Sequence, residues 1–260
     1  MRGFAKSLEP AICDNITRIR LVEDGKMQGA GEAQLPGNVS DPLYWQRRCA
    51  VVIAGLGWIA LTLQLYVNIR WALVNDKSIP ATVINYFSYF TTETNLLIAI
   101  MLTITCARPQ TEQFLTRPSI AGALVVYIIV ICGVYEVLLR KLWHPHGIQL
   151  LADYIMHDAI PFLYPLYWLV FLPKGHLRWT DPAWWAVYPI LYFLYSMLRG
   201  AAYGIYLYPF IDAAQLGVAR AWGNAVLLLA LFIGLGTGLT AVDRALASGG
   251  RRRLGRAAEL

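Results

Sequence analysis

The chain has 260 residues, of which 57% are hydrophobic and 15% are charged, with a net charge of +6 and a positive mean hydropathy. Soluble proteins contain about 25% charged residues, so this composition excludes an ordinary soluble domain and favours an integral membrane protein. The basic residues stand in short segments between apolar runs and in the final RRRLGR stretch, which does not resemble a nucleic-acid-binding patch. We expect membrane lipid as a partner and no nucleic acid, and the sequence identifies no protein partner.

The cysteines argue against a disulfide-stabilised or metal-binding protein, and the first segment argues against a cleaved signal peptide. The four cysteines are scattered without CxxC or Cys/His spacing, so we expect neither a disulfide framework nor a metal site, and no cofactor. The first 45 residues lack the apolar core of a cleaved signal peptide. We interpret residues 1–46 as a flexible cytoplasmic arm, residues 47–243 as a six-helix transmembrane domain and residues 244–260 as a basic cytoplasmic tail.

Hydrophobic segments of similar length follow one another along the chain. A helix needs about 20 mainly apolar residues to cross the hydrocarbon core of a bilayer. By that measure the predicted membrane helices cover residues 49–68, 83–106, 120–138, 153–172, 183–204 and 218–242. The intervening segments are short and contain Pro, Gly or charged residues, which end hydrophobic helices. The predicted fold is therefore an all-α integral membrane protein, a six-transmembrane-helix bundle with short loops.

The lysines and arginines near the ends of these helices predict the orientation, because cytoplasmic loops carry an excess of basic residues. An even number of helices places both termini on one side. That side holds the larger set, Arg47, Arg48, Arg108, Arg117, Lys174, Arg178, Arg244, Arg251, Arg252, Arg253 and Arg256. The opposite side holds Arg70, Lys77, Arg140, Lys141 and Arg220. We predict a multi-pass protein integral to the plasma (inner) membrane, with both termini cytoplasmic.

Polar residues interrupt several predicted helices in one half of the bilayer. A rise of about 1.5 Å per residue places Thr91 and Thr92 roughly 12–14 Å, and His157 roughly 6–8 Å, below the same face. Arg199 and Asn224 lie about 7 Å and about 9 Å below it on the same scale. Ionisable groups inside a membrane cost about 2.5–3.5 kcal/mol each and usually face a cavity or the bundle interior. We expect a polar cavity that opens toward the loops after the first, third and fifth helices. The residues expected at this site are Thr91, Thr92, Glu93, Asn95, His157, Asp158, Arg199 and Asn224.

A hydroxyl and an imidazole are the minimum for nucleophilic acyl transfer. Thr91 or Thr92 would attack a carbonyl group, and His157 would take the proton. Donors such as Asn95 or Arg199 would stabilise the oxyanion, and Asp158 or Asp153 would tune the imidazole. No GxSxG, HExxH or GxxxxGK[ST] signature is present, so the common soluble hydrolases, metalloproteases and nucleotide triphosphatases are not indicated.

Three motifs, YFSYFTTETNLL, MHDAIPFLYPLYWL and YGIYLYPFID, occur in this order along the chain. Together they resemble the bacterial predicted six-transmembrane protein family and, more distantly, the androgen-induced and androgen-dependent integral membrane proteins of animals. The resemblance covers about residues 45–245. The animal proteins are threonine hydrolases that cleave fatty acid esters of hydroxy fatty acids with one Thr and one His. The resemblance therefore implies hydrolysis of these or similar acyl esters, with His157 as the base. For the nucleophile we prefer Thr91, which follows Tyr89 and Phe90, and keep Thr92 as the alternative if the motif is aligned from the following Asn.

A non-enzymatic protein is the other hypothesis that the sequence leaves open. In a small transporter or a lipid-binding scaffold, Glu93, Arg199 and His157 would form a relay or a structural network. A Glu93–Arg199 ion pair is the natural centre of such a network. These two charges need not be shared by the animal proteins, so the substrate could also differ.

Overall fold

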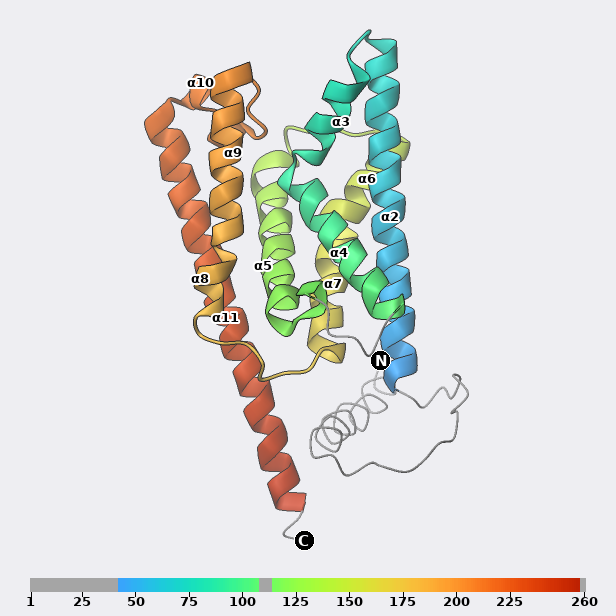
Figure 1. Ribbon diagram of the computed structural model, residues 1–260, viewed down its shortest axis with the longest axis vertical. Coiled ribbons are helices and arrows are strands. Elements are labelled where there is room, and N and C mark those ends of the chain that lie inside the picture. Colours follow the sequence, from blue (N-terminus) through green and yellow to red (C-terminus); the bar gives the residue numbers. More distant parts are fainter. Residues whose placement is uncertain (1–41, 108–113, 258–260) are drawn as a thin grey trace.

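The computed structural model describes residues 42–107 and 114–257, with side chains described up to residue 249. All regular elements in these two ranges are helices, and they run together as one bundle (Figure 1). The all-α class predicted from the sequence is confirmed. The predicted arm before Pro42, and the basic side chains of the tail beyond Gly249, lie outside the described residues.

The first three predicted membrane helices correspond to helical segments with some divisions. The first is α2 (Pro42–Val74), and the second is divided into α3 (Ile79–Phe87) and α4 (Phe90–Ala107). A short 3-10 turn, η1 (Phe114–Thr116), precedes the third. The third is α5 (Pro118–Val134), which continues into a π-helical turn, η2 (Tyr135–Leu139).

The last three are also helical. The fourth comprises α6 (Ile148–Tyr154), the π-helical turn η3 (Ile155–Ala159) and α7 (Ile160–Phe171). The fifth comprises α8 (Asp181–Trp185) and α9 (Val187–Tyr203). Two short elements follow, η4 (Pro209–Ile211) and α10 (Ala213–Leu216), before the sixth, α11 (Val218–Ala257).

Four of the described helices are long and apolar enough to cross a membrane, namely those over Pro42–Val74, Phe90–Ala107, Pro118–Leu139 and Val218–Gly249. The predicted helices at 153–172 and 183–204 are each built from shorter pieces, which meet at η3 and at the junction of α8 with α9. Two predicted boundaries also move. Helix α2 begins at Pro42, inside the predicted arm, and α11 continues through the predicted tail as far as Ala257.

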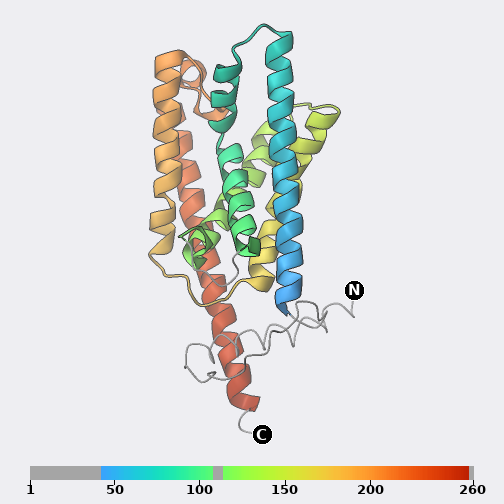
Figure 2. The same cartoon turned by 45° about the vertical axis from the view of Figure 1, so that its right-hand side comes forward.

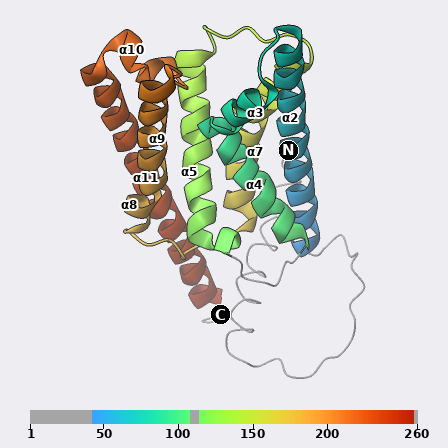
Figure 3. The same cartoon turned by 45° about the horizontal axis from the view of Figure 1, so that its top comes forward.

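Helix α5 occupies the centre of the bundle. The views in Figures 1 and 2 agree that α9 and α11 lie beside each other on one side, and that α2 lies on the other. Figure 3 shows α5 between these two groups, and α5 contacts α4, α7, α8 and α11. Because neighbours surround it, its buried residues lie on all of its faces: Ala121, Gly122, Ala123, Leu124, Val125, Val126, Tyr127, Ile128, Val130 and Ile131.

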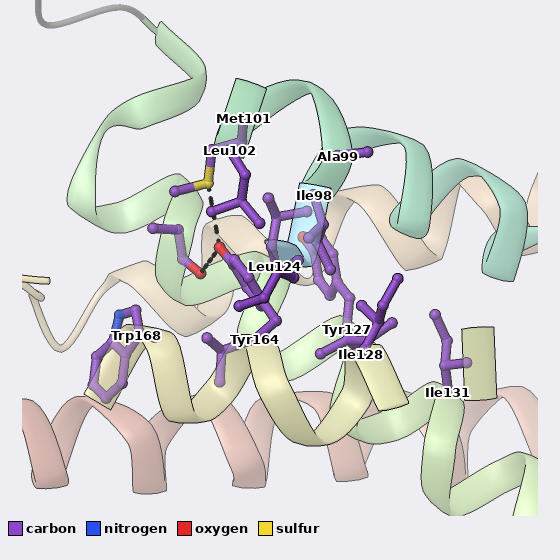
Figure 4. Close-up of a cluster of buried hydrophobic side chains, with 14 of the residues drawn as sticks. Ile98, Ala99, Met101, Leu102, Leu124, Tyr127, Ile128, Ile131, Tyr164 and Trp168 are labelled. Atoms are coloured by element: carbon purple, nitrogen blue, oxygen red, sulfur yellow. Dashed lines mark hydrogen bonds between the residues drawn. The ribbon is translucent and has the colours of Figure 1, made fainter. Parts of the chain in front are cut away.

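The core contains a hydroxyl group that links three helices (Figure 4). The side chain of Tyr164, on α7, is fully buried. Its hydroxyl oxygen lies 3.2 Å from the sulfur of Met101 on α4 and 3.2 Å from the carbonyl oxygen of Ala121 on α5. Close packing continues at Gly57 on α2, where an added Cβ would lie 3.2 Å from the Cβ of Ala99 on α4. These contacts fix the relative positions of the helices that carry the site described below.

The segment between α7 and α8 is attached to α11 by the buried carboxylate of Asp243. This carboxylate accepts hydrogen bonds from the backbone N–H groups of Gly175 (2.9 Å) and Leu177 (3.0 Å). The ammonium group of Lys174 donates to two carbonyl groups at the end of α7. Burial lowers the pKa of Lys174 to about 8, and the nearby charge of Asp243 opposes this shift.

Candidate functional site

Two cavities inside the bundle share part of their lining. The larger has a volume of about 1040 Å³ and is lined by residues of α2, α3, α4, η2, η3 and α9. Its lining includes Lys77, Trp143 and Leu207, which belong to the segments after the first, third and fifth predicted helices. This is the end of the bundle at which the sequence predicts a polar cavity. The smaller cavity, about 270 Å³, lies among mainly apolar side chains of α5, α9 and α11.

The boundary between the cavities contains a threonine and a histidine, the two residue types that the predicted acyl transfer would need. The side chains that line both cavities are Thr91, Tyr135, Leu139, His157 and Tyr208. Thr92, Asp153 and Arg199 line only the larger cavity. Four residues predicted from the sequence line neither cavity, namely Glu93, Asn95, Asp158 and Asn224.

His157 lies in the π-helical turn η3, and the proline that follows this turn accounts for it. A proline has no N–H group, and its ring crowds the carbonyl group four residues earlier, which for Pro161 is that of His157. The N–H group of Ile160 instead bonds to the carbonyl of Ile155, five residues back. The carbonyl of Met156 is therefore left without a donor in its own helix, because the residue five positions ahead of it is Pro161.

Asn95 uses this available carbonyl. Its side-chain nitrogen donates to the carbonyl oxygen of Met156 (3.4 Å) and to that of Thr91 (2.9 Å), and the side chain is fully buried. One amide thus joins the turn that carries Thr91 to the residue directly before His157. In this structure Asn95 links two backbone segments and lines neither cavity, so the substrate or oxyanion contact expected from the sequence stays a prediction.

The imidazole of His157 is held by two neighbours. Its Nδ1 lies 3.2 Å from the carboxylate Oδ1 of Asp153 and 3.1 Å from the backbone oxygen of the same residue. The Tyr135 ring stacks on the imidazole, with centroids 3.9 Å apart and planes 13° apart. The hydroxyl of Tyr135 donates to the other oxygen of Asp153 at 2.5 Å. A carboxylate at Nδ1 favours a proton on that nitrogen, which leaves Nε2 as the basic atom.

Asp158, the other carboxylate considered for this role, has a different partner. It forms an ion pair with Arg140 (2.5 Å), which also pairs with Glu136 one turn earlier in the chain. Hydrogen bonds to Glu136 and Asp158 raise the pKa of Arg140. These contacts join η2 to η3, so Asp158 supports the position of the turn and Asp153 orients the imidazole.

Thr91 and Thr92 lie in the first turn of α4, directly after the break between α3 and α4. Hydroxyl groups from α9 stabilise this break, because Tyr192 donates to the carbonyl of Ser88 (3.0 Å) and the hydroxyl of Tyr195 lies 2.7 Å from that of Ser88. In this turn the N–H group of Thr91 faces the hydroxyl of Tyr208 (3.4 Å), and the N–H group of Glu93 donates to the carbonyl of Tyr89 (3.0 Å). Within residues 42–107 and 114–257, no backbone carbonyl accepts from the N–H of Thr92.

Tyr208 is the partner of Thr91 in this structure. Its hydroxyl oxygen lies 3.4 Å from both the backbone nitrogen and the hydroxyl oxygen of Thr91. In the described part of the chain no hydrogen bond joins His157 to the hydroxyl of Thr91 or Thr92. The fold therefore brings Thr91 and His157 to one boundary without a direct hydrogen bond between them.

The predicted ion pair between Glu93 and Arg199 is wrong. Glu93 accepts a hydrogen bond from the hydroxyl of Tyr188 (2.5 Å), and Arg199 donates to the side-chain oxygen of Asn85 (3.0 Å). Tyr188 and Arg199 are three turns apart on α9, roughly 16 Å along the axis, so one carboxylate cannot reach both. Asn224 donates to the carbonyl of Phe210 (2.7 Å) and so supports the segment that carries Tyr208.

Two tyrosines at the boundary were missed as site residues. Tyr208 belongs to the YPF motif, so a signal for it was present in the sequence. Tyr135 carries no such signal, because the chain has 15 tyrosines and this one lies in an apolar run. Its role depends on the stacking of η2 against η3, which only the folded chain provides.

Comparisons of the chain with protein-family models, with curated proteins and with solved structures gave no match.

Proposed function

We propose that this chain is an integral membrane protein that hydrolyses acyl esters of lipids, with Thr91 as the nucleophile and His157 as the general base. The observation that carries the proposal is that both residues, from different helices, line both a larger cavity with polar and apolar walls and a smaller apolar one. An ester whose acyl chain occupies the apolar cavity would present its carbonyl group at that boundary. The motifs that resemble the threonine hydrolases include these same two residues.

The exposed surface supports insertion into a membrane. Soluble proteins rarely expose contiguous apolar patches larger than a few hundred Å². Here large apolar side chains are exposed along the outer helices α2, α9 and α11, and examples are Val51, Val52, Ile59, Leu191, Leu198, Val226 and Leu227. We infer a bundle that crosses the plasma membrane six times with both termini in the cytoplasm, as the distribution of Lys and Arg predicts.

The first half of the proposed reaction forms an acyl-enzyme. Asp153 keeps the proton on Nδ1 of His157, so Nε2 accepts the proton of the Thr91 hydroxyl as its oxygen attacks the ester carbonyl carbon. The step requires rotation of the Thr91 side chain from Tyr208 toward His157. The C–O bond of the tetrahedral intermediate then breaks, and the imidazolium returns its proton to the leaving alkoxide. The alcohol leaves, and the acyl group stays on Thr91.

The second half releases the acid. A water molecule gives its proton to Nε2 of His157 and attacks the acyl-threonine carbonyl, and the proton then returns to the Thr91 oxygen as the bond breaks. Negative charge develops on the carbonyl oxygen in both halves. The N–H of Thr92 and the hydroxyl of Tyr208 are the donors available to it beside Thr91.

Alanine substitutions at three positions test this assignment. Hydrolysis of p-nitrophenyl palmitate by the purified protein should fall at least about 10²-fold in Thr91→Ala and His157→Ala, because each loses a group that takes part in bond formation or proton transfer. Thr92→Ala should keep activity within a few fold. Thr105→Ala is the matched control, because Thr105 lies on the same helix, bonds to the carbonyl of Met101 and lines neither cavity.

Full activity in His157→Ala would contradict the mechanism, and loss in Thr92→Ala alone would move the nucleophile by one residue. One observation favours a second candidate, a lipid-binding protein without catalysis: the Thr91 hydroxyl faces Tyr208 in place of His157. A folded parent chain that binds palmitoyl esters and releases no acid would support that candidate.

A further inference from the structure

Arg199 has an unsatisfied charged group beside the larger cavity. Its Nη2 donates to the side-chain oxygen of Asn85, while its Nη1 is buried and has no hydrogen-bond partner among the described residues. No described carboxylate lies within 4.0 Å of the guanidinium. A guanidinium stays charged in proteins and offers its N–H groups in a planar fork that fits two oxygens of one oxyanion. Leaving a charged donor buried and unpaired is unfavourable. Arg199 lines the larger cavity, so a turn of its guanidinium toward that cavity would open Nη1 to a negatively charged ligand.

The cavity lining has a positive excess at this position. Its basic side chains are Arg199 and the exposed Lys77, and its one acidic side chain among the described residues is Asp153. The carboxylate of Asp153 is already occupied by Tyr135 and His157. Asp153 therefore does not form an ion pair with Arg199, and the two basic side chains of the lining exceed its one carboxylate by one charge.

The smaller cavity indicates the chemistry of the rest of such a ligand, beyond its anionic group. Side chains such as Val134, Leu229 and Phe232 make it apolar, and it shares Thr91 and His157 with the lining of the larger cavity. A molecule that fills both spaces has a hydrocarbon chain on one side of the boundary and a polar, charged end on the other.

We propose that the site takes an amphiphile with one hydrocarbon chain and an oxyanion, a carboxylate or a phosphate, that binds Arg199. The chain occupies the apolar cavity, and the guanidinium, which donates to Asn85 through Nη2, turns Nη1 toward the oxyanion in the larger cavity. This inference rests on the proposed function only in placing the ester of a substrate at Thr91. The anion site itself stands on Arg199 and the two cavities.

Binding of three amphiphiles that share a 16-carbon chain tests the proposal. Palmitate, hexadecyl phosphate and hexadecanol are titrated into the full chain in neutral-lipid nanodiscs, with tryptophan fluorescence as the readout, because Trp71 and Trp143 line the larger cavity and Trp222 the smaller. We expect at least one oxyanion to bind at least about tenfold more tightly than hexadecanol. Tight binding of palmitate alone would show that the site prefers a carboxylate, and tight binding of hexadecyl phosphate alone that it prefers a phosphate. Tight binding of both would show a general oxyanion site.

Arg199→Gln should lower the affinity for the preferred oxyanion at least about tenfold and leave hexadecanol binding unchanged. The oxyanion affinity of Arg199→Lys should lie between those of the parent chain and of Arg199→Gln, because lysine keeps the positive charge but lacks the planar pair of N–H donors. Arg220→Gln is the matched control, because Arg220 is an exposed arginine near the start of α11 that lines neither cavity. Equal affinity of the parent chain for hexadecanol and both oxyanions would overturn the proposal, and this result does not depend on the folding of a variant.

The same titration separates this proposal from the proposed function. Oxyanion binding that persists in the parent chain and in His157→Ala, without hydrolysis of esters by the parent chain, would retain the anion site and reject the hydrolase. Hydrolysis by the parent chain with unchanged oxyanion affinity in Arg199→Gln would retain the hydrolase and reject the anion site.

Discussion

At the scale of single residues, Asp153 and Asp158 show how neighbouring carboxylates acquire different roles. Asp153 is 7% exposed and lies one helical turn before His157, so its carboxylate reaches Nδ1 of the imidazole. Asp158 follows His157 directly in the chain and therefore projects in another direction, where Arg140 neutralises it. Asp158 is nearer to His157 in the sequence than Asp153 is, yet only Asp153 contacts the imidazole, because Asp158 is paired with Arg140.

The substitutions Asp153→Asn and Asp158→Asn test whether only Asp153 acts on His157. Asp153→Asn keeps the shape of the side chain and removes the charge that holds the proton on Nδ1, so we expect kcat for palmitoyl ester hydrolysis to fall about 10²–10⁴-fold with little change in KM. Asp158→Asn should keep kcat within a few fold. Steady-state kinetics of both purified variants makes the comparison, and equal loss of kcat in the two would show that neither carboxylate acts specifically on His157.

At the scale of helices, the positions of the helical segments were predictable, whereas their exact ends and their interruptions were not. Apolar runs and Pro, Gly or charged breaks determine where the helices begin and end, and they predict the segments that α2, α5 and α11 occupy. The break after Ser88 lacks Gly and Pro, and hydroxyl groups from α9, more than 100 positions later in the chain, stabilise it. Distant contacts of this kind do not appear in a local pattern.

The candidate site was predictable to a similar extent. Depth along the helices brings Thr91, His157 and Arg199 to one end of the bundle, and all three line the larger cavity. Depth does not give rotation about a helix axis, which is why Glu93 was assigned to Arg199 and in fact contacts Tyr188. Pro161 was visible in the sequence as a member of the IPF motif, and its effect on the preceding turn follows only once the helix is known to continue through it.

Replacing Pro161 tests the role of the π-helical turn. Pro161→Ala restores a backbone N–H, which allows regular α-helical bonding through residues 155–161 and rotates His157 relative to α4. We expect at least about a tenfold loss of esterase activity together with an unchanged or higher midpoint of thermal unfolding. Pro165→Ala is the control, because Pro165 lies one turn later inside α7 and lines neither cavity. Equal activity in the two variants would show that the turn does not position His157.

At the scale of the whole molecule, the larger cavity and the arginines near the termini lie at opposite ends of the bundle, which predicts its orientation in a membrane. The larger cavity lies toward the end of the bundle that carries Lys77 and Trp143, and the ends of α2 and α11 that carry Arg47 and Arg244 lie away from it. Since basic residues favour the cytoplasm, the larger cavity would open toward the outer face. Its polar ligands would then enter from the outer leaflet or from outside the cell.

Reporter fusions test this orientation. Green fluorescent protein fused after Leu260 should fluoresce, and alkaline phosphatase fused at the same place should be inactive, because the C-terminus is expected in the cytoplasm. Alkaline phosphatase fused after Lys77, which follows the first membrane helix, should be active. An active phosphatase at the C-terminus would reverse the orientation and would place the larger cavity on the cytoplasmic side.

The division of one hydrophobic segment into α3 and α4 also has an electrostatic consequence. Aligned peptide groups give a helix the equivalent of roughly +0.5 elementary charge at its N-terminus, and in an uninterrupted membrane helix that charge would lie near the water interface. Because a new helix begins at Phe90, the positive end of its macrodipole lies instead in the interior, at the turn that carries Thr91 and Thr92. The lower dielectric constant of that environment strengthens its field. The break thus places the positive end of α4, beside the negative end of α3, at the turn where the proposed reaction would form an oxyanion.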